Sequence, residues 1–321
     1  MKSKVSIVTA ALVLMALVSG GLLAGPGCDS AGGTSDKSGG KIPVVATTSM
    51  IGDLVARIGG DRVELKVIMG AGVDPHTFKP SPSDFADLAR GKLCFYNGLH
   101  LEGKMVETFE HKLKDKSVAV AETIPVDKLL PWQAGQGGAY DPHVWFDVSL
   151  WAKAAEAVRD ALVKHDPAGA EDYRRRADEV LASMNALHAE VTAKIASVPK
   201  ERRVLITSHD AYNYFHKAYD IEVRGLQGIS TETEAGIQAI NGAVDYIMAK
   251  KIPAIFVESS VSPKTIERVQ ADCRARGFEV KIGGELFSDA MGQPGQHPGY
   301  AVETYEGMVR YNVDTVVAAL K

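Results

Sequence analysis

Apolar positions in the first half of the chain alternate between a strand-like and a helix-like pattern. Short apolar runs with β-branched residues, typical of buried strands, occur at 42–49 (IPVVATTS), 63–69 (VELKVIM), 92–98 (KLCFYNG) and 117–122 (SVAVAE). Segments with helical spacing follow the first three runs, at 50–60, 81–91 and 105–113. Strands that alternate with helices indicate βαβ units, so we predict a parallel sheet flanked by helices.

A long helical pattern follows this first region. A helix is predicted at 151–165, and a second pattern starts at Pro167 and continues to about residue 198. Its apolar residues recur at helical spacing, namely Val180, Met184, Leu187, Val191 and Ile195. A helix of about 30 residues would span roughly 45 Å, which suits a stiff connector between two lobes.

The alternation starts again after Pro199. Strands are predicted at 202–208, 221–228, 252–259 and 278–284, and helices at 211–219, 233–251, 262–277 and 307–321. The sequence therefore predicts an α/β fold of two lobes, each a parallel sheet flanked by helices, bridged by one long rigid helix. We assign residues 42–166 to the first lobe, 167–198 to the connecting helix and 199–321 to the second lobe.

The amino-terminal segment has a different composition. Lysines at 2 and 4 precede a long apolar run and then small residues, which is typical of a secretory signal over residues 1–27. A retained membrane helix is the alternative, because the run is close to the minimum length for a span. Cys28 follows small residues in LLAGPGC, and a Gly/Ser-rich tether continues to residue 41.

Composition and cysteine usage narrow the classes of function. The chain has 321 residues and a net charge of −4, without a basic block, so a nucleic-acid partner is not expected. The other two cysteines, Cys94 and Cys273, are predicted in different lobes, and a disulfide needs Cα atoms within about 7 Å. We therefore expect two buried free thiols.

Three of the nine histidines are predicted at the carboxyl ends of strands, where ligands bind in open parallel sheets. His76 and His143 each end an Asp-Pro-His tripeptide, and His209 follows the strand at 202–208. Proline fixes the backbone before the first two. The pattern predicts a metal site, with the candidate neighbour His100. His111, His165 and His188 are expected to face solvent, His216 to pack, and His297 to lie in an exposed, mobile loop.

A fourth ligand is expected from the second lobe. Glu285 and Asp289 lie in the loop ELFSDAMG, and Glu258 ends the strand at 252–259. Glu258 could be a ligand, an acceptor for a histidine N–H, or an ion-pair partner. Imidazole and carboxylate ligands suit Zn²⁺, and a bidentate aspartate would suit Mn²⁺; they disfavour Ca²⁺ and Mg²⁺.

Several stretches together resemble one family. These are VDPHTFKPSPSD, FYNGLHLE, DPHVWFDVSLW, SHDAYNYF, LQGISTETEAG, IFVESSVSPK and GGELFSDAMG. The chain resembles the zinc/manganese solute-binding lipoproteins of bacterial ABC importers. The resemblance implies a metal between two lobes, held by His76, His143, His209 and Asp289. It also implies a lipid anchor at Cys28, although Gly25 and Pro26 depart from the usual pattern before that cysteine.

The resemblance implies a function outside the cytoplasm. The protein would be a periplasmic or extracytoplasmic, membrane-anchored monomer that captures Zn²⁺ or Mn²⁺ as cargo and delivers it to a membrane permease. The long histidine-rich loop of zinc-selective members is replaced by LLPWQAGQGGAY, which has no histidine. A zinc hydrolase is the main alternative, but the chain has no HExxH motif. A metal-binding surface adhesin without transport is the second.

Overall fold

The computed structural model describes residues 40–132 and 139–321, so the signal segment and Cys28 lie outside the described residues. The first region forms a four-stranded parallel sheet in the order β2-β1-β3-β4. Its strands are β1 (Ile42–Ala46), β2 (Val63–Val67), β3 (Leu93–Tyr96) and β4 (Ser117–Ala119). The helices of this region are α1 (Ser49–Gly59), α2 (Pro82–Arg90) and α3 (Val148–His165).

The carboxy-terminal region contains two parallel strand pairs, β5-β6 and β7-β8. The strands are β5 (Val204–Thr207), β6 (Glu222–Gly225), β7 (Ala254–Glu258) and β8 (Lys281–Leu286). The helices are α5 (Asn213–Tyr219), α6 (Ile237–Lys250), α7 (Lys264–Ala275) and α8 (Tyr305–Leu320). The parallel α/β architecture predicted from the strand–helix alternation is therefore confirmed.

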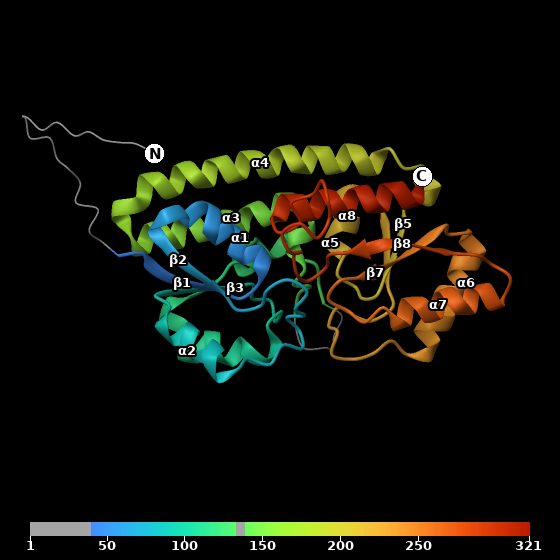
Figure 1. Ribbon diagram of the computed structural model, residues 1–321, viewed down its shortest axis with the longest axis horizontal. Coiled ribbons are helices and arrows are strands. Elements are labelled where there is room, and N and C mark those ends of the chain that lie inside the picture. The colour runs from blue at the N-terminus through green and yellow to red at the C-terminus, as the bar shows by residue number, and fades with distance from the viewer. Residues whose placement is uncertain (1–39, 133–138) are drawn as a thin grey trace, which may run out of the picture. The chain divides into compact units, whose positions relative to one another are not determined.

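The predicted long helix is present as α4 (Ala170–Ala196), which has 27 residues. It directly follows a 3-10 turn at Pro167–Gly169. In Figure 1 it runs beside α1 and α3 and then along α8. Its apolar stripe, from Val180 to Ile195, is buried. That stripe belongs to one core cluster that also includes residues of β1, α1, α3 and α8.

Element boundaries differ from the predicted ones by up to four residues, and the helix predicted at 233–251 starts at Ile237. The predicted helix at 105–113 is present but irregular: a 3-10 turn at Gly103–Met105 leads into a π-helical turn at Thr108–Lys112. The last strand starts three residues later than predicted, because Phe278 still caps α7. Its N–H donates to the carbonyl of Cys273 (2.9 Å), after Gly277 adopts a left-handed conformation with φ of 83°. Pairing with the neighbouring strand begins at Lys281.

The helix that follows the second Asp-Pro-His tripeptide starts at a fixed point. A 3-10 turn at Val144–Phe146 comes directly after His143, and Asp147 then caps α3. The Asp147 carboxylate accepts the N–H groups of Ser149 (2.9 Å) and Leu150 (3.3 Å). The chain around His143 is therefore held between the turn and a well-capped helix.

Both downstream cysteines are free and buried, as predicted. In the described part of the chain, none of the helices combines the length and the apolar character that a membrane span requires. This finding does not concern the apolar segment before residue 40.

Candidate metal centre

Four side chains from four separate loops meet inside the protein. They are His76 after β2, His143 before α3, His209 after β5 and Asp289 after β8. One ligand atom from each lies within 4.8 Å of the others. All four residues are at most 2% exposed. The structure therefore brings together every ligand that the resemblance implied.

The two Asp-Pro-His tripeptides form the same local turn. In each, Oδ1 of the aspartate accepts the backbone N–H of the histidine two residues later, at 2.9 Å for both Asp74–His76 and Asp141–His143. Such a side-chain turn, with proline at its centre, fixes the backbone before the histidine. The sequence alone indicated this role for the prolines and not for the aspartates. An Asp directly before Pro was the available signal.

The two aspartates differ in what else they bind. Oδ1 of Asp141 also lies 2.8 Å from Nδ1 of the His143 ring. Oδ2 of Asp74 instead accepts the hydroxyls of Thr77 (2.9 Å) and Thr231 (2.6 Å). Asp141 therefore orients an imidazole, whereas Asp74 fixes the backbone and links its loop to the segment after β6.

His209 is oriented by a carboxylate from a different strand. Glu258, the last residue of β7, accepts the His209 backbone N–H at 2.9 Å and lies 2.5 Å from its Nδ1. Glu258 is therefore the acceptor for a histidine N–H and the ion-pair partner of that ring when the ring is protonated, and it is not a member of the cluster itself. When Nδ1–H donates to a carboxylate, Nε2 carries the lone pair that a metal ion needs. Glu285 lies in β8 and is not part of the cluster.

The remaining atoms face one another at the centre. His76 Nε2 and His143 Nε2 are 3.2 Å apart, and each oxygen of Asp289 approaches a different imidazole. Oδ1 lies 3.4 Å from His143 Nε2, and Oδ2 lies 3.2 Å from His209 Nε2. These are ion-pair distances, but both Asp289 oxygens and His209 Nε2 lack a hydrogen bond of acceptable geometry. Buried polar atoms without partners are costly, and a cation shared among them removes that cost.

Burial and charge shift the pKa values of this cluster in different directions. Burial lowers the pKa of His76 to about 3, which keeps it neutral. Burial also opposes charge on His143 and His209, but Asp141 raises the pKa of the former, and Glu258 raises that of the latter well above its usual value. Burial alone would raise the pKa of Asp289, yet His209 beside it holds that pKa well below its ordinary range. A cation at this centre would take the place of protons on these imidazoles.

A cavity of about 570 Å³ lies beside the cluster. Its described lining includes Asp141, which also holds His143, and Asp210, which follows His209. The cavity is lined from both regions of the chain, by residues of 130–132 and 141 on one side and of 210–229 on the other. None of the four clustered side chains is in its described lining, so the cluster itself stays closed beneath these residues.

The other histidines lie away from the cluster. His100, His111 and His165 are exposed, and His100 is not a member of the group. His188 is half-buried rather than solvent-facing, because its Nδ1 lies 3.0 Å from the Tyr219 hydroxyl. His216 is exposed and bonded to the carbonyl of Ile221, so the packing role is wrong. His297 is also half-buried, since its ring stacks on Tyr311 with centroids 4.1 Å apart.

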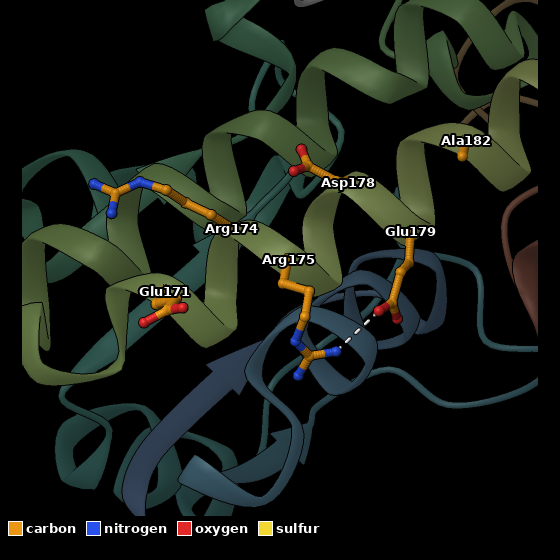
Figure 2. Close-up of a pocket in the computed structure, with 6 residues that line it drawn as sticks. All are labelled: Glu171, Arg174, Arg175, Asp178, Glu179 and Ala182. Atoms are coloured by element: carbon orange, nitrogen blue, oxygen red, sulfur yellow. Dashed lines mark hydrogen bonds and ion pairs between the residues drawn. The ribbon is translucent and has the colours of Figure 1, made fainter.

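A second depression, on the outer face of α4, has a different character (Figure 2). Its charged side chains include Arg175 and Glu179, which form an ion pair at 2.9 Å and are more than half exposed. Oppositely charged side chains one turn apart neutralise each other on a solvated helix face. The face has the character of a solvated surface, and it adds nothing to the metal centre.

The chain is similar to characterised proteins over almost all of its described length. The family described as zinc-uptake complex component A, periplasmic (ZnuA), matches residues 44–319. The manganese-binding lipoprotein MntA of Bacillus subtilis is 43% identical over 300 residues, covering 93% of this chain and 95% of that protein. The zinc-binding protein TroA of Treponema pallidum is 46% identical over 283 residues, covering 88% and 89%.

The fold agrees with these matches. The solved periplasmic zinc-binding protein TroA from Treponema pallidum superimposes with a TM-score of 0.83 at 46% identity, covering 88% of this chain and 99% of that one. Members of the family are solute-binding lipoproteins that work outside the cytoplasm and are not enzymes, which excludes the zinc-hydrolase alternative. The chain belongs to the ZnuA family, as a metal-binding component of an ABC uptake system for zinc or manganese.

Proposed function

We propose that His76, His143, His209 and Asp289 hold one Zn²⁺ or Mn²⁺ ion, which the protein passes to the membrane permease of its uptake system. One observation carries the proposal: four buried ligand atoms from four loops converge within 4.8 Å. Three imidazole nitrogens and a carboxylate are a ligand set that suits both ions, through four-coordinate geometry for Zn²⁺ or a bidentate carboxylate for Mn²⁺.

The choice between the two ions depends on more than affinity. The intrinsic order of stability favours Zn²⁺ over Mn²⁺ at any nitrogen and oxygen site. Two similar proteins are named for different ions, manganese for MntA and zinc for TroA. The ion carried in the cell therefore depends on the geometry that the protein imposes and on the metals available to it.

We also propose the arrangement of the chain around this function. Residues 42–166 and 199–321 form the two lobes, the segment 167–198 connects them, and Cys28 carries the lipid anchor. The packing of α4 against α1, α3 and α8 supports small shifts of loops or lobes on release rather than wide opening. Scattering profiles that are similar with and without metal are expected, and a large compaction on binding would contradict the rigid connector.

The decisive experiment combines elemental analysis with competition titration. Protein purified without added metal is analysed for its metal content, and Zn²⁺ and Mn²⁺ are then titrated in competition with a chelator. His209→Ala is expected to lower affinity for both ions at least 10-fold. The exposed His165 is the control, since His165→Ala removes an imidazole that touches none of the ligands. Equal affinities for the two variants would show that the site lies elsewhere.

Transport is tested separately from binding. A strain without the gene should grow poorly when metal is scarce, and added Zn²⁺ or Mn²⁺ should restore growth. A gene that encodes the wild type should restore growth without added metal, and a gene that encodes His209→Ala should not. A deletion strain that grows normally but adheres poorly would favour the adhesin alternative instead.

A further inference from the structure

Trp145 connects the loop of one proposed ligand to the loop of another. It lies two residues after His143 and is 0% exposed. Its indole N–H donates to the carbonyl of Ser288 at 2.9 Å, the residue directly before Asp289. The His143 and Asp289 segments, which are separated by more than 140 residues in sequence, are thus linked by a single buried side chain.

Trp145 is held both at its ring and at its backbone. Its ring meets the His143 ring edge-on, with centroids 5.2 Å apart and an interplanar angle of 65°. The Trp145 backbone carbonyl accepts the hydroxyl of Tyr305, at the start of α8, at 2.6 Å. Since both its side chain and its backbone bind the carboxy-terminal region, Trp145 has little freedom to turn.

The accepting carbonyl is part of the peptide group that leads into Asp289. A peptide group is planar, so a bond that fixes the Ser288 carbonyl also fixes the direction of the Asp289 N–H and the start of its backbone. The residue before is held from its own region, because Asn312 bonds the Phe287 N–H (2.9 Å) and carbonyl (2.7 Å). The bond from Trp145 therefore acts where the loop turns toward the metal centre.

We propose that Trp145 is a positioning residue that sets how the Asp289 carboxylate meets the ion, and thereby the preference between Zn²⁺ and Mn²⁺. The inference rests on the proposed ligand set. In the structure each Asp289 oxygen faces a different imidazole, so a carboxylate held in this orientation can offer both oxygens, which raises the coordination number and suits Mn²⁺. A carboxylate free to rotate can turn one oxygen away and offer only the other, which favours four-coordinate Zn²⁺.

The chain supplies a matched control for this test. Trp151 is also 0% exposed, and its ring lies 6.3 Å from that of Trp145 in the same core. Its indole nitrogen, however, has no hydrogen-bond partner among the described residues. Trp145→Phe and Trp151→Phe therefore remove the same group of atoms from one core, but only Trp145→Phe removes a donor to the Asp289 loop.

The readout is the ratio of the two metal affinities, together with the absorption spectrum of the Co²⁺-loaded protein. In Trp145→Phe, Mn²⁺ affinity should fall about tenfold, as for other groups that orient a ligand. Zn²⁺ affinity should fall less, and the Co²⁺ bands should strengthen as the coordination number falls. Trp151→Phe should keep the wild-type ratio and spectrum. An unchanged ratio and spectrum in Trp145→Phe would overturn the inference.

Two further variants complete the design. Should Trp145→Phe fail to fold, Tyr305→Phe provides the same test, because it removes the hydroxyl that holds the Trp145 backbone. The affinity ratio is expected to change in the same direction, and an unchanged ratio would overturn the inference.

His209→Ala separates the inference from the proposed function. If His209→Ala binds metal normally, the ligand set is wrong; if it does not, while Trp145→Phe keeps the wild-type ratio, only the role of Trp145 fails.

Discussion

The Nδ1 atom of His209 lies 2.5 Å from Oε2 of Glu258, a residue 49 positions later in the chain. The same carboxylate accepts the His209 backbone N–H at 2.9 Å. Glu258 thus orients the ring and the backbone of the histidine together. The strands β5 and β7 belong to separate strand pairs but pack against each other, which brings the end of β7 to the loop after β5.

Replacing Glu258 by Gln should weaken metal binding by about 10- to 100-fold, because the ring keeps an acceptor but loses the charge that increases its basicity. Competition titration measures the change. Glu267→Gln, on the exposed face of α7, is the matched control and should bind as the wild type does. Equal affinity of the Glu258 variant and the control would show that the carboxylate serves only to fold the chain.

The two Asp-Pro-His turns provide a second comparison. Asp141→Asn should weaken metal binding by about tenfold or more, because Asp141 binds the His143 ring as well as its backbone. Asp74→Asn should have a smaller effect, because the described contact between Asp74 and His76 involves the backbone N–H of the histidine and not its ring. Isothermal titration of both variants tests this order. A larger loss in Asp74→Asn would reverse the roles assigned to the two aspartates.

Metal binding should release protons at neutral pH. In the metal-free protein the pKa values of His143 and His209 are raised, so these imidazoles hold protons that the ion displaces. Affinity should therefore fall as pH falls, and it should still be rising with pH above the ordinary histidine pKa of about 6.5. Calorimetry at pH 7 in buffers of different ionisation enthalpy should give about one proton or more per ion. A release of zero would contradict the raised pKa values.

Glu102 should make stability depend on pH in the direction opposite to a surface ion pair. Burial raises the pKa of Glu102 from 4.5 to about 7, against hydrogen bonds from Asn97 and Thr47. A carboxyl with a raised pKa stabilises the fold fully below pH 4.5, and this contribution is lost as pH rises to about 7. The free energy of unfolding is measured by urea denaturation of the metal-free protein at several pH values.

Glu102→Gln provides the control for that measurement, because it removes the titrating group and leaves all others in place. The wild type should lose on the order of 2 kcal/mol more than the variant between pH 4.5 and pH 7. Parallel pH profiles for the two proteins would show that Glu102 does not titrate in this range.

The sequence predicted the fold well wherever a local pattern decided it. The alternation of strands and helices and the apolar stripe of α4 follow from residue spacing alone, and both are present. At residues 105–113 the helical spacing predicted a helix but not its irregular form, which combines a 3-10 and a π-helical turn. The last strand was displaced by the cap that Phe278 provides for α7.

The candidate site was predictable in part. Placement at strand ends pointed to His76, His143 and His209, and the structure brings them together with Asp289. The groups that orient these ligands were harder to find. Glu258 and Trp145 act on residues far away in sequence, so only the packed fold reveals their partners. His297 was predicted to be exposed because its loop is rich in Gly and Pro, but its ring packs against Tyr311, a contact that the local sequence does not reveal.

The buried stripe of α4 also has a mechanical consequence. The core cluster that contains this stripe includes side chains from Val44 near one end of the described chain to Leu320 at the other. Separation of the two regions would expose apolar surface along the whole helix, so they should melt in a single cooperative transition. An ion bound by four loops would then raise the melting temperature of the entire fold, and a protease would find few partly open forms to cut. Metal loading would in this way extend the lifetime of the protein outside the cytoplasm as well as fill its site.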